Sequence, residues 1–175
     1  MSYTYNYPRP AVTVDTIVLS KRSAEKPSHL LLIQRKHPPC QDQWALPGGF
    51  VDEGEPLDAA AARELQEETS VDPASVDLIQ VGSYGDPGRD PRGWTITVAY
   101  AAIVPSMDLG VKAADDARAA QWFDVRSLPP LAFDHKVIVR DALTKYIPTL
   151  SDGEMVDEFK KGVESLQGPW IRPTM

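Results

Sequence analysis

Residues 49–71 read GFVDEGEPLDAAAARELQEETSV, and this stretch decides the fold. An acidic, glycine-containing loop leads directly into an alanine-rich segment. Alanine, leucine, glutamate and arginine favour helices, and Pro56 suits a first helical turn because no backbone hydrogen is needed there. We therefore predict a helix over residues 56–69.

The predicted helix carries three glutamates on its apolar side. With about 100° of rotation per residue, Glu64, Glu67 and Glu68 fall within an arc of about 100°. Leu57 and Ala60 project into the same sector. Carboxylates one turn apart repel one another, and partial burial adds a desolvation cost. Either the pKa values of these carboxylates rise, or a cation compensates their charge.

The neighbouring residues favour a hard divalent cation. Oxygen ligands without histidine or cysteine nearby favour Mg²⁺, with Mn²⁺ as a substitute. Gly48 and Gly49 let the backbone approach a ligand closely and would place a carbonyl beside the helix. Arg63, four residues before Glu67 and eight after Glu55, can brace the carboxylates from one side. For the glutamates taken alone, a solvated acidic helix face is the alternative.

The pattern resembles the signature of the Nudix hydrolases: Gly, five residues, Glu, seven residues, then Arg-Glu-apolar-X-Glu-Glu-X-Gly-apolar. Here Gly49, Glu55 and RELQEETSV at residues 63–71 fill it. One defined position departs, because Ser70 stands where the family has glycine. A left-handed conformation is usual at that helix end, so serine should cost about 1 kcal/mol of stability. No ligand is lost.

This resemblance implies an α/β fold: an α/β/α sandwich with a central mixed sheet and a loop–helix–loop metal site. It also implies metal-dependent hydrolysis of a nucleoside diphosphate linked to another group. By position, Glu55 and Arg63 would hold the helix in register. The implied metal ligands are the carbonyl of Gly48 and the side chains of Glu64, Glu67 and Glu68.

Hydrolysis requires a carboxylate that takes a proton from the attacking water. Glu67 or Glu68 can do so if the metal does not saturate it. In related enzymes an acidic residue on a later loop can serve instead, and Asp115 and Asp116 are the candidates here. The predicted catalytic residues are Arg63, Glu67, Glu68 and Asp116.

A second stretch, DPGRDPRGW at residues 86–94, bears on which diphosphate binds. Arginine forks on a proline-stiffened loop suit phosphate or ribose oxygens, and the aspartates could accept hydrogen bonds from ribose hydroxyls. A surface loop with internal Asp–Arg pairs is the alternative. Together with RPAVTVD at 9–15 and LAFDH at 131–135, the stretch resembles the ADP-ribose pyrophosphatase branch and related sensor domains of NAD-metabolism regulators.

The predicted substrate-binding residues are Arg35, Trp44, Asp86, Arg89, Asp90, Arg92 and His135. Arg35 could equally be a plain surface residue. Trp44 could stack on adenine, although a core position before Pro-Gly-Gly is the stronger interpretation. The resemblance implies that His135 faces the substrate, whereas the sequence alone favours an ordinary residue of a first helical turn.

The expected reaction is hydrolysis of ADP-ribose to AMP and ribose 5-phosphate. Other Nudix substrates, namely NADH, a nucleotide sugar or a damaged nucleotide, are the nearest alternative. A non-catalytic ADP-ribose sensor is another, but the intact glutamates disfavour it, and the 27 residues after Pro148 are few for a DNA-binding module. An isomerase would need an acid/base pair acting on carbon, and the sequence indicates none.

The remaining sequence predicts one domain over residues 1–150 and a C-terminal tail over 151–175. A second helix should begin after Asp134 as N-cap and end before Pro148. In the tail, Met155, Phe159 and Val163 recur every four residues and indicate a short amphipathic helix. The predicted strands are 10–20, 29–35, 78–84, 94–104 and 119–125.

The composition limits the kinds of partner and the compartment that we expect for this protein. A net charge of −7 disfavours binding to nucleic-acid phosphates, and no segment has the apolar length of a membrane span. A single cysteine and the lack of a signal-like start favour the cytoplasm. The expected partner is a small nucleoside diphosphate. The apolar tail and Trp170 would cover a core edge or a second subunit, and we expect a homodimer because relatives are often dimers.

Overall fold

The β-branched run AVTVDTIVLS forms β1 (Ala11–Ser20), the central strand of a mixed sheet. The computed structural model describes residues 4–114 and 117–168. Every residue of β1 from position 13 onward is buried, as expected for a strand covered on both faces. On one side β1 pairs in parallel with β6 (Thr95–Val104) along its whole length.

The other edge of β1 is shared between two strands. β2 (His29–Arg35) pairs with its C-terminal end, and the short β4 (Gly48–Phe50) pairs antiparallel with its N-terminal half. This change of partner brings the segment before β4 against the middle of the sheet. The outer strands are β3 (Trp44–Ala45), β5 (Ile79–Tyr84) and β7 (Ala117–Asp124), which pair with β2, β6 and β2 respectively.

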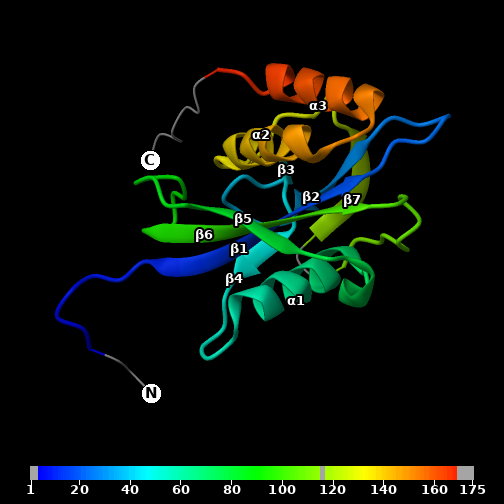
Figure 1. Ribbon diagram of the computed structural model, residues 1–175. Coiled ribbons are helices and arrows are strands. Elements are labelled where there is room, and N and C mark those ends of the chain that lie inside the picture. Colours follow the sequence, from blue (N-terminus) through cyan, green and yellow to red (C-terminus); the bar gives the residue numbers. More distant parts are fainter. Residues whose placement is uncertain (1–3, 115–116, 169–175) are drawn as a thin grey trace.

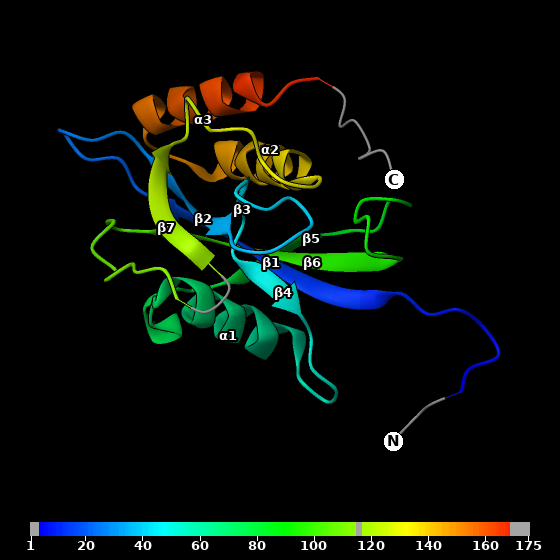
Figure 2. The same cartoon turned by 180° about the vertical axis from the view of Figure 1, so that it is seen from behind.

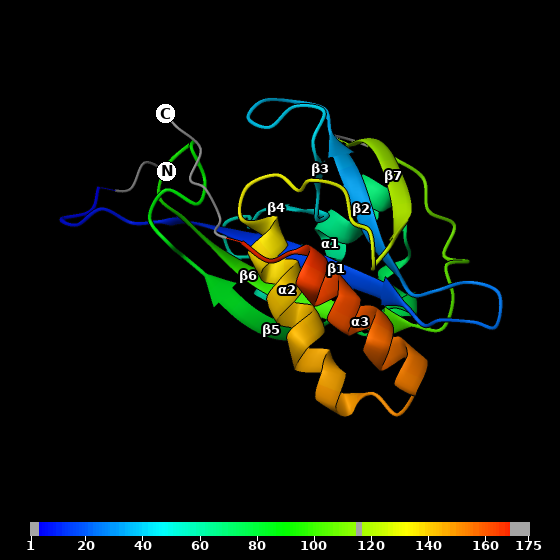
Figure 3. The same cartoon turned by 90° about the horizontal axis from the view of Figure 1, so that it is seen from above.

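Three α-helices cover the sheet in two layers (Figures 1 and 2). α1 (Leu57–Thr69) lies on one face, whereas α2 (His135–Tyr146) and α3 (Gly153–Ser165) lie side by side on the other (Figure 3). Short 3-10 turns follow α1 and α2 at Pro73–Ser75 and Ile147–Thr149. The described chain is therefore an α/β/α sandwich, as the resemblance implied.

Each face of the sheet has its own hydrophobic core. Under α1, Leu65 packs with Val18 and Leu31. Under α2 and α3, Leu143 and Phe159 pack with the other sides of β1 and β2 in a larger cluster. No helix in the described part of the chain is both long enough and apolar enough to cross a bilayer.

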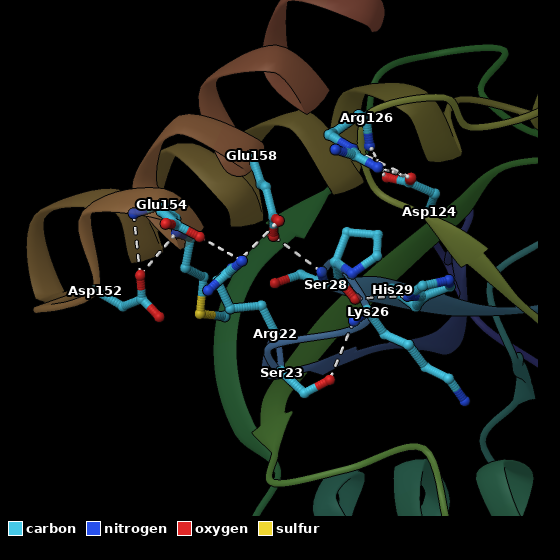
Figure 4. Close-up of polar contacts among 12 residues, drawn as sticks. Arg22, Ser23, Lys26, Ser28, His29, Asp124, Arg126, Asp152, Glu154 and Glu158 are labelled. Carbon is cyan, nitrogen blue, oxygen red and sulfur yellow. Dashed lines mark hydrogen bonds and ion pairs between the residues drawn. The ribbon is translucent and has the colours of Figure 1, made fainter.

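The helix predicted in the tail is α3, and it packs onto the same core as the rest of the chain. Met155 and Phe159 are almost fully buried. The carboxylate of Asp152 caps the helix by accepting hydrogen bonds from two backbone N–H groups. Glu158 fixes it to the β1–β2 connection, because it accepts the backbone N–H of Ser28 at 2.9 Å and pairs with Arg22 (Figure 4).

The five strands and three helices predicted from the sequence are present. The ends of the strands and of the first two helices are displaced by at most two residues, and the tail helix, predicted without bounds, is Gly153–Ser165. β3 and β4 were not predicted, because strands of two and three residues show no period. Asp134 does precede α2, but its carboxylate caps no backbone group and instead binds Arg89. Trp170 lies outside the described residues, and the homodimer remains a prediction.

Ser70 ends α1 in the left-handed conformation expected from its place in the pattern, with φ of 60°, and its N–H donates to the carbonyl of Gln66. A side chain in this region is strained, because Cβ crowds the backbone. The departure from the family pattern therefore affects the helix end and removes no side chain from the glutamate cluster.

Replacing Ser70 by glycine should raise the free energy of unfolding by about 0.5–1 kcal/mol, because the strain of the left-handed residue disappears. Urea denaturation measures the change. Ser83→Gly is the matched control, since Ser83 is an exposed residue of extended strand β5 and should lose stability on the same substitution. Equal effects of the two substitutions would contradict the conformational explanation.

Candidate active site

The segment joining β3 to β4 comes very close to β1. The carbonyl of Pro47 accepts hydrogen bonds from the backbone N–H and the hydroxyl of Thr16, at 2.8 and 3.0 Å. A Cβ on Gly48 would lie 2.1 Å from the carbonyl oxygen of Val14. A Cβ on Gly49 would lie 2.6 Å from the carboxylate of Glu64. Gly48 therefore requires glycine for its close approach to β1, whereas a side chain at Gly49 would displace the carboxylate of Glu64.

The three glutamates of α1 differ in their surroundings. Glu68 is 8% exposed and its Oε2 accepts the backbone N–H of Gly48 at 2.9 Å. Burial raises the pKa of Glu68 to about 8, and burial likewise raises the pKa of Glu64. Glu67 is exposed. The cluster thus holds carboxylate charge where water stabilises it poorly.

Arg63 ties the acidic loop to the helix. Its Nε and Nη2 donate to the two carboxylate oxygens of Glu55 at 2.7 and 2.8 Å, and its Nη1 donates to Glu64 and Glu67 at 2.8 and 2.9 Å. Its Nη2 also donates to the carbonyl of Phe50. These hydrogen bonds lower the pKa of Glu55 to about 2. Arg63 therefore makes the bracing contacts expected of it.

The donor set of this cluster suits a hard divalent cation. Its ligands would be oxygens only, and a bound cation would stabilise the charged forms of Glu68 and Glu64, which burial disfavours. In residues 4–114 and 117–168, no three His, Cys, Asp or Glu side chains are arranged around a common ion position. Arg63 lies between Glu64 and Glu67 instead.

A cavity of about 440 Å³ opens over the cluster. Glu64, Glu67 and Glu68 line one part of it, and the cations Arg35 and Arg92 contribute to the lining as well. A smaller recess of about 30 Å³ adjoins it and shares Arg35, Arg92 and the two glycines. A cavity with acidic and basic linings can hold a cation and a polyanion together.

The two arginines of the basic lining lie against aromatic rings. The guanidinium of Arg35 is 4.9 Å from the ring centre of Phe133, and that of Arg92 is 4.9 Å from Phe50 and 5.7 Å from Phe133. Asp90 accepts a bidentate pair of hydrogen bonds from Arg92. Burial, and then the charge of Arg92, lower the pKa of Arg35. An anion between these arginines would relieve their mutual repulsion.

Arg89 is placed differently from Arg92. It is 4% exposed, and its Nε and Nη2 donate to the carboxylate of Asp134 at 2.8 and 2.7 Å. This buried pair anchors the 86–93 loop to the start of α2. Arg89 lines the smaller recess, but its hydrogen bonds are directed to the protein. Arg92 is also paired with a carboxylate of the protein, that of Asp90, but its side chain is 40% exposed against 5% for Arg89, so Arg92 is the more accessible of the two to a ligand.

The other predicted residues lie in three different settings. Trp44 lines neither cavity and packs edge-on against Phe123, in the core position given as its alternative. Asp86 is exposed and also lines neither cavity. His135 is buried beside the smaller recess. Asp115 and Asp116 lie outside the described residues, so the general base predicted there stays a prediction.

Several cavity residues were missed by the sequence analysis. Only Asp15 gave a signal, as an acidic residue within the otherwise apolar strand VTVDTIV. Phe50 ends the short strand β4, and the others belong to loops whose course the sequence does not indicate. The missed charged and aromatic residues are Asp15, Lys36, His37, Phe50, Asp52 and Phe133.

Comparison with known proteins places this site in a family. Residues 9–142 match the family model of the NUDIX domain. An ADP-ribose pyrophosphatase of Methanocaldococcus jannaschii is 44% identical over 135 residues, which are 77% of this chain and 74% of that protein. The ADPR responsive transcriptional repressor NtrR of Acinetobacter baylyi is 37% identical over 144 residues, or 80% of this chain, which spans only 56% of the repressor.

Among solved structures, the NUDIX domain of Shewanella oneidensis NrtR complexed with ADP ribose superposes with a TM-score of 0.70 at 31% identity, covering 79% of this chain and 90% of that one. The loop–helix–loop with its buried glutamate, the match over residues 9–142 and the 44% identical relative lead to one conclusion. The chain belongs to the Nudix family.

Proposed function

We propose that this Nudix protein hydrolyses the diphosphate bond of ADP-ribose to AMP and ribose 5-phosphate, with Mg²⁺ or Mn²⁺ as cofactor. The observation that carries the proposal is the buried carboxylate of Glu68, held by Gly48 in a cavity that also contains Arg35 and Arg92. Two relatives support the choice of substrate: the 44% identical protein is an ADP-ribose pyrophosphatase, and the Shewanella NUDIX domain forms a complex with ADP ribose.

The metal ligands in this proposal are the Gly48 carbonyl, Glu64, Glu67 and Glu68. A bound divalent cation would neutralise phosphate charge and lower the pKa of the attacking water. Arg92 and Arg35 bind phosphate oxygens, since Arg92 is preoriented by Asp90 and both guanidinium groups lie on aromatic faces. Arg63 holds Glu64 and Glu67 at fixed places on the helix.

Glu68 is the general base that the described residues support best. Its Oε2 accepts the N–H of Gly48, which leaves Oε1 to accept a proton when the metal is held by the other ligands and does not occupy this oxygen. Burial raises its pKa to about 8, so the carboxylate holds a proton more readily than an exposed glutamate does. Glu67, and Asp116 outside the described residues, are the alternatives.

A second candidate function is non-catalytic sensing of ADP-ribose. The 37% identity to a repressor that responds to ADPR favours it. Incubation with ADP-ribose, NADH, a nucleotide sugar and a damaged nucleotide in Mg²⁺, followed by chromatography of the products, separates these functions. AMP and ribose 5-phosphate from ADP-ribose support the proposal. Binding of ADP-ribose without turnover supports sensing, and faster turnover of another substrate identifies a different Nudix specificity.

Glu68→Gln should lower kcat by about 10²–10⁴-fold, because the amide can neither accept the proton nor carry the charge that binds a cation. Steady-state kinetics with ADP-ribose measure the loss. Glu158→Gln is the matched control, since Glu158 is similarly buried and also accepts a backbone N–H at 2.9 Å, but on the opposite face of the sheet. Unchanged turnover in Glu68→Gln would remove Glu68 from the chemistry.

Without metal, Glu68 should make folding depend on pH. Its pKa is about 8 in the folded protein, and about 4.3 is usual for an unfolded glutamate. The folded state therefore keeps a proton that the unfolded state has lost, and stability falls as pH rises through 8. In EDTA, wild type should lose about 1–3 kcal/mol more than Glu68→Gln between about pH 5 and 8.5.

Urea denaturation of both proteins across this range provides the measurement, because every other titrating group is shared. Parallel curves for wild type and Glu68→Gln would mean that the buried carboxylate does not destabilise the folded state when it ionises.

Arg92→Ala should raise the KM for ADP-ribose about tenfold, since a charge-assisted phosphate contact is worth roughly 1.5–3 kcal/mol at most. Arg126→Ala is the matched control: Asp124 and Arg126 form the same bidentate pair two residues apart, but line neither cavity. Kinetics should show no change in that variant. If both substitutions left KM unaltered, Arg92 would have no part in binding substrate.

A further inference from the structure

Both ring nitrogens of His135 face protein atoms. The backbone N–H of Leu46 donates to Nδ1 at 2.9 Å, and Nε2 lies 3.4 Å from Oδ1 of Asp15. A backbone N–H can only donate, so Nδ1 must be the acceptor and the neutral ring carries its proton on Nε2. Burial lowers the pKa of His135, which keeps the ring neutral. His135 therefore acts toward Leu46 as a fixed acceptor.

The carboxylate of Asp15 faces Nε2 and favours the tautomer that carries the proton there. Its Oδ2 accepts the hydroxyl of Thr97 at 2.6 Å and lies 3.8 Å from Nη2 of Arg89. That leaves Oδ1 facing the imidazole. Asp15 and Thr97 are both buried, so this arrangement is part of the sheet rather than a surface contact.

The segment fixed by His135 runs directly into the glutamate cluster. Leu46 is held by α2 through His135, Pro47 by β1 through Thr16, and Gly48 by α1 through Glu68. Only one residue separates Leu46 from Gly48, and that residue is a proline with a restricted φ. A displacement of Leu46 therefore passes to Gly48 and to the oxygen of Glu68 that it holds.

We infer that His135 is a positioning residue: its Nδ1 accepts the N–H of Leu46 and so sets the position of Gly48 against Glu68. This role differs from the substrate contact that the sequence suggested, because both ring nitrogens are directed to the protein. The inference rests on the proposed function for its kinetic consequences. The hydrogen bond itself can be tested without any substrate.

Two substitutions distinguish the roles of the two ring nitrogens of His135. In His135→Asn, Oδ1 is attached to Cγ as Nδ1 is, so it can accept the N–H of Leu46. In His135→Gln, the amide lies one carbon further out and corresponds to Nε2. The glutamine can meet Asp15 but leaves the buried N–H of Leu46 without its acceptor.

We expect His135→Gln to lower kcat for ADP-ribose about ten- to a hundredfold with little change in KM, because misplaced catalytic groups act on the chemical step. His135→Asn should keep kcat within about threefold of wild type by the same argument. Equal losses in two folded variants, or full activity in His135→Gln, would overturn the inference. A raised KM with unchanged kcat in both variants would instead assign His135 to substrate binding.

Nuclear magnetic resonance of ¹⁵N-labelled wild type supplies the readout that needs no turnover. An unprotonated Nδ1, a protonated Nε2 and a coupling between Nδ1 and the Leu46 nitrogen are expected across the N–H···N bond. The same coupling should be absent from His135→Gln, with the Gly48 amide resonance displaced. If no substrate is hydrolysed, the proposed function fails while this measurement still decides the inference. A protonated Nδ1 in wild type would overturn it.

Discussion

A carboxylate kept away from water between β4 and α1 is the constraint on which the site depends. Glu68 is stabilised by one backbone N–H, that of Gly48, and burial works against its charge. Carboxylates whose pKa is raised by burial are concentrated at functional sites, where an ionisable oxygen at a fixed position takes part in binding or chemistry. Three further contacts fix the surroundings of Glu68. They are the close approach of the Gly48–Gly49 backbone, the hydrogen bonds of Arg63 and the hydrogen bond from Leu46 to His135.

The same local pattern, an aspartate paired with an arginine two residues later, occurs both at the basic side of the cavity and away from it. Asp90 with Arg92 and Asp124 with Arg126 are the same bidentate pair at the same spacing. Only the first lies over aromatic rings and beside the glutamates, where an anion can use it. Arg89, three residues before Arg92, is committed to Asp134 and supports the loop. Position in the fold, rather than residue type, decides which of these arginines is accessible from the cavity and which is buried as a support.

The sequence predicted the parts of the structure that depend on local pattern. The glutamate arc on α1, the long strands and the left-handed Ser70 follow from periodicity, composition and the family signature. It could not predict β3 and β4, which are two and three residues long and are defined only by their pairing with β2 and β1. It also could not separate Arg89 from Arg92, or show that His135 faces Leu46, since those distinctions arise from contacts between distant segments.

The parallel pairing at the centre of the sheet has a consequence for how the chain folds. β1 lies near the N-terminus and pairs along its length with β6, whose residues 95–104 come much later in the sequence. Closing so large a loop costs entropy before the pairing offsets it, and such topologies fold slowly. During synthesis the edge of β1 that pairs with β6 stays unpaired after β2 and β4 have been made, and it is open to association with other chains. α1, with its glutamates, is synthesised before β6, the strand that completes the sheet beneath it, so the glutamate cluster gains its full support only late in folding.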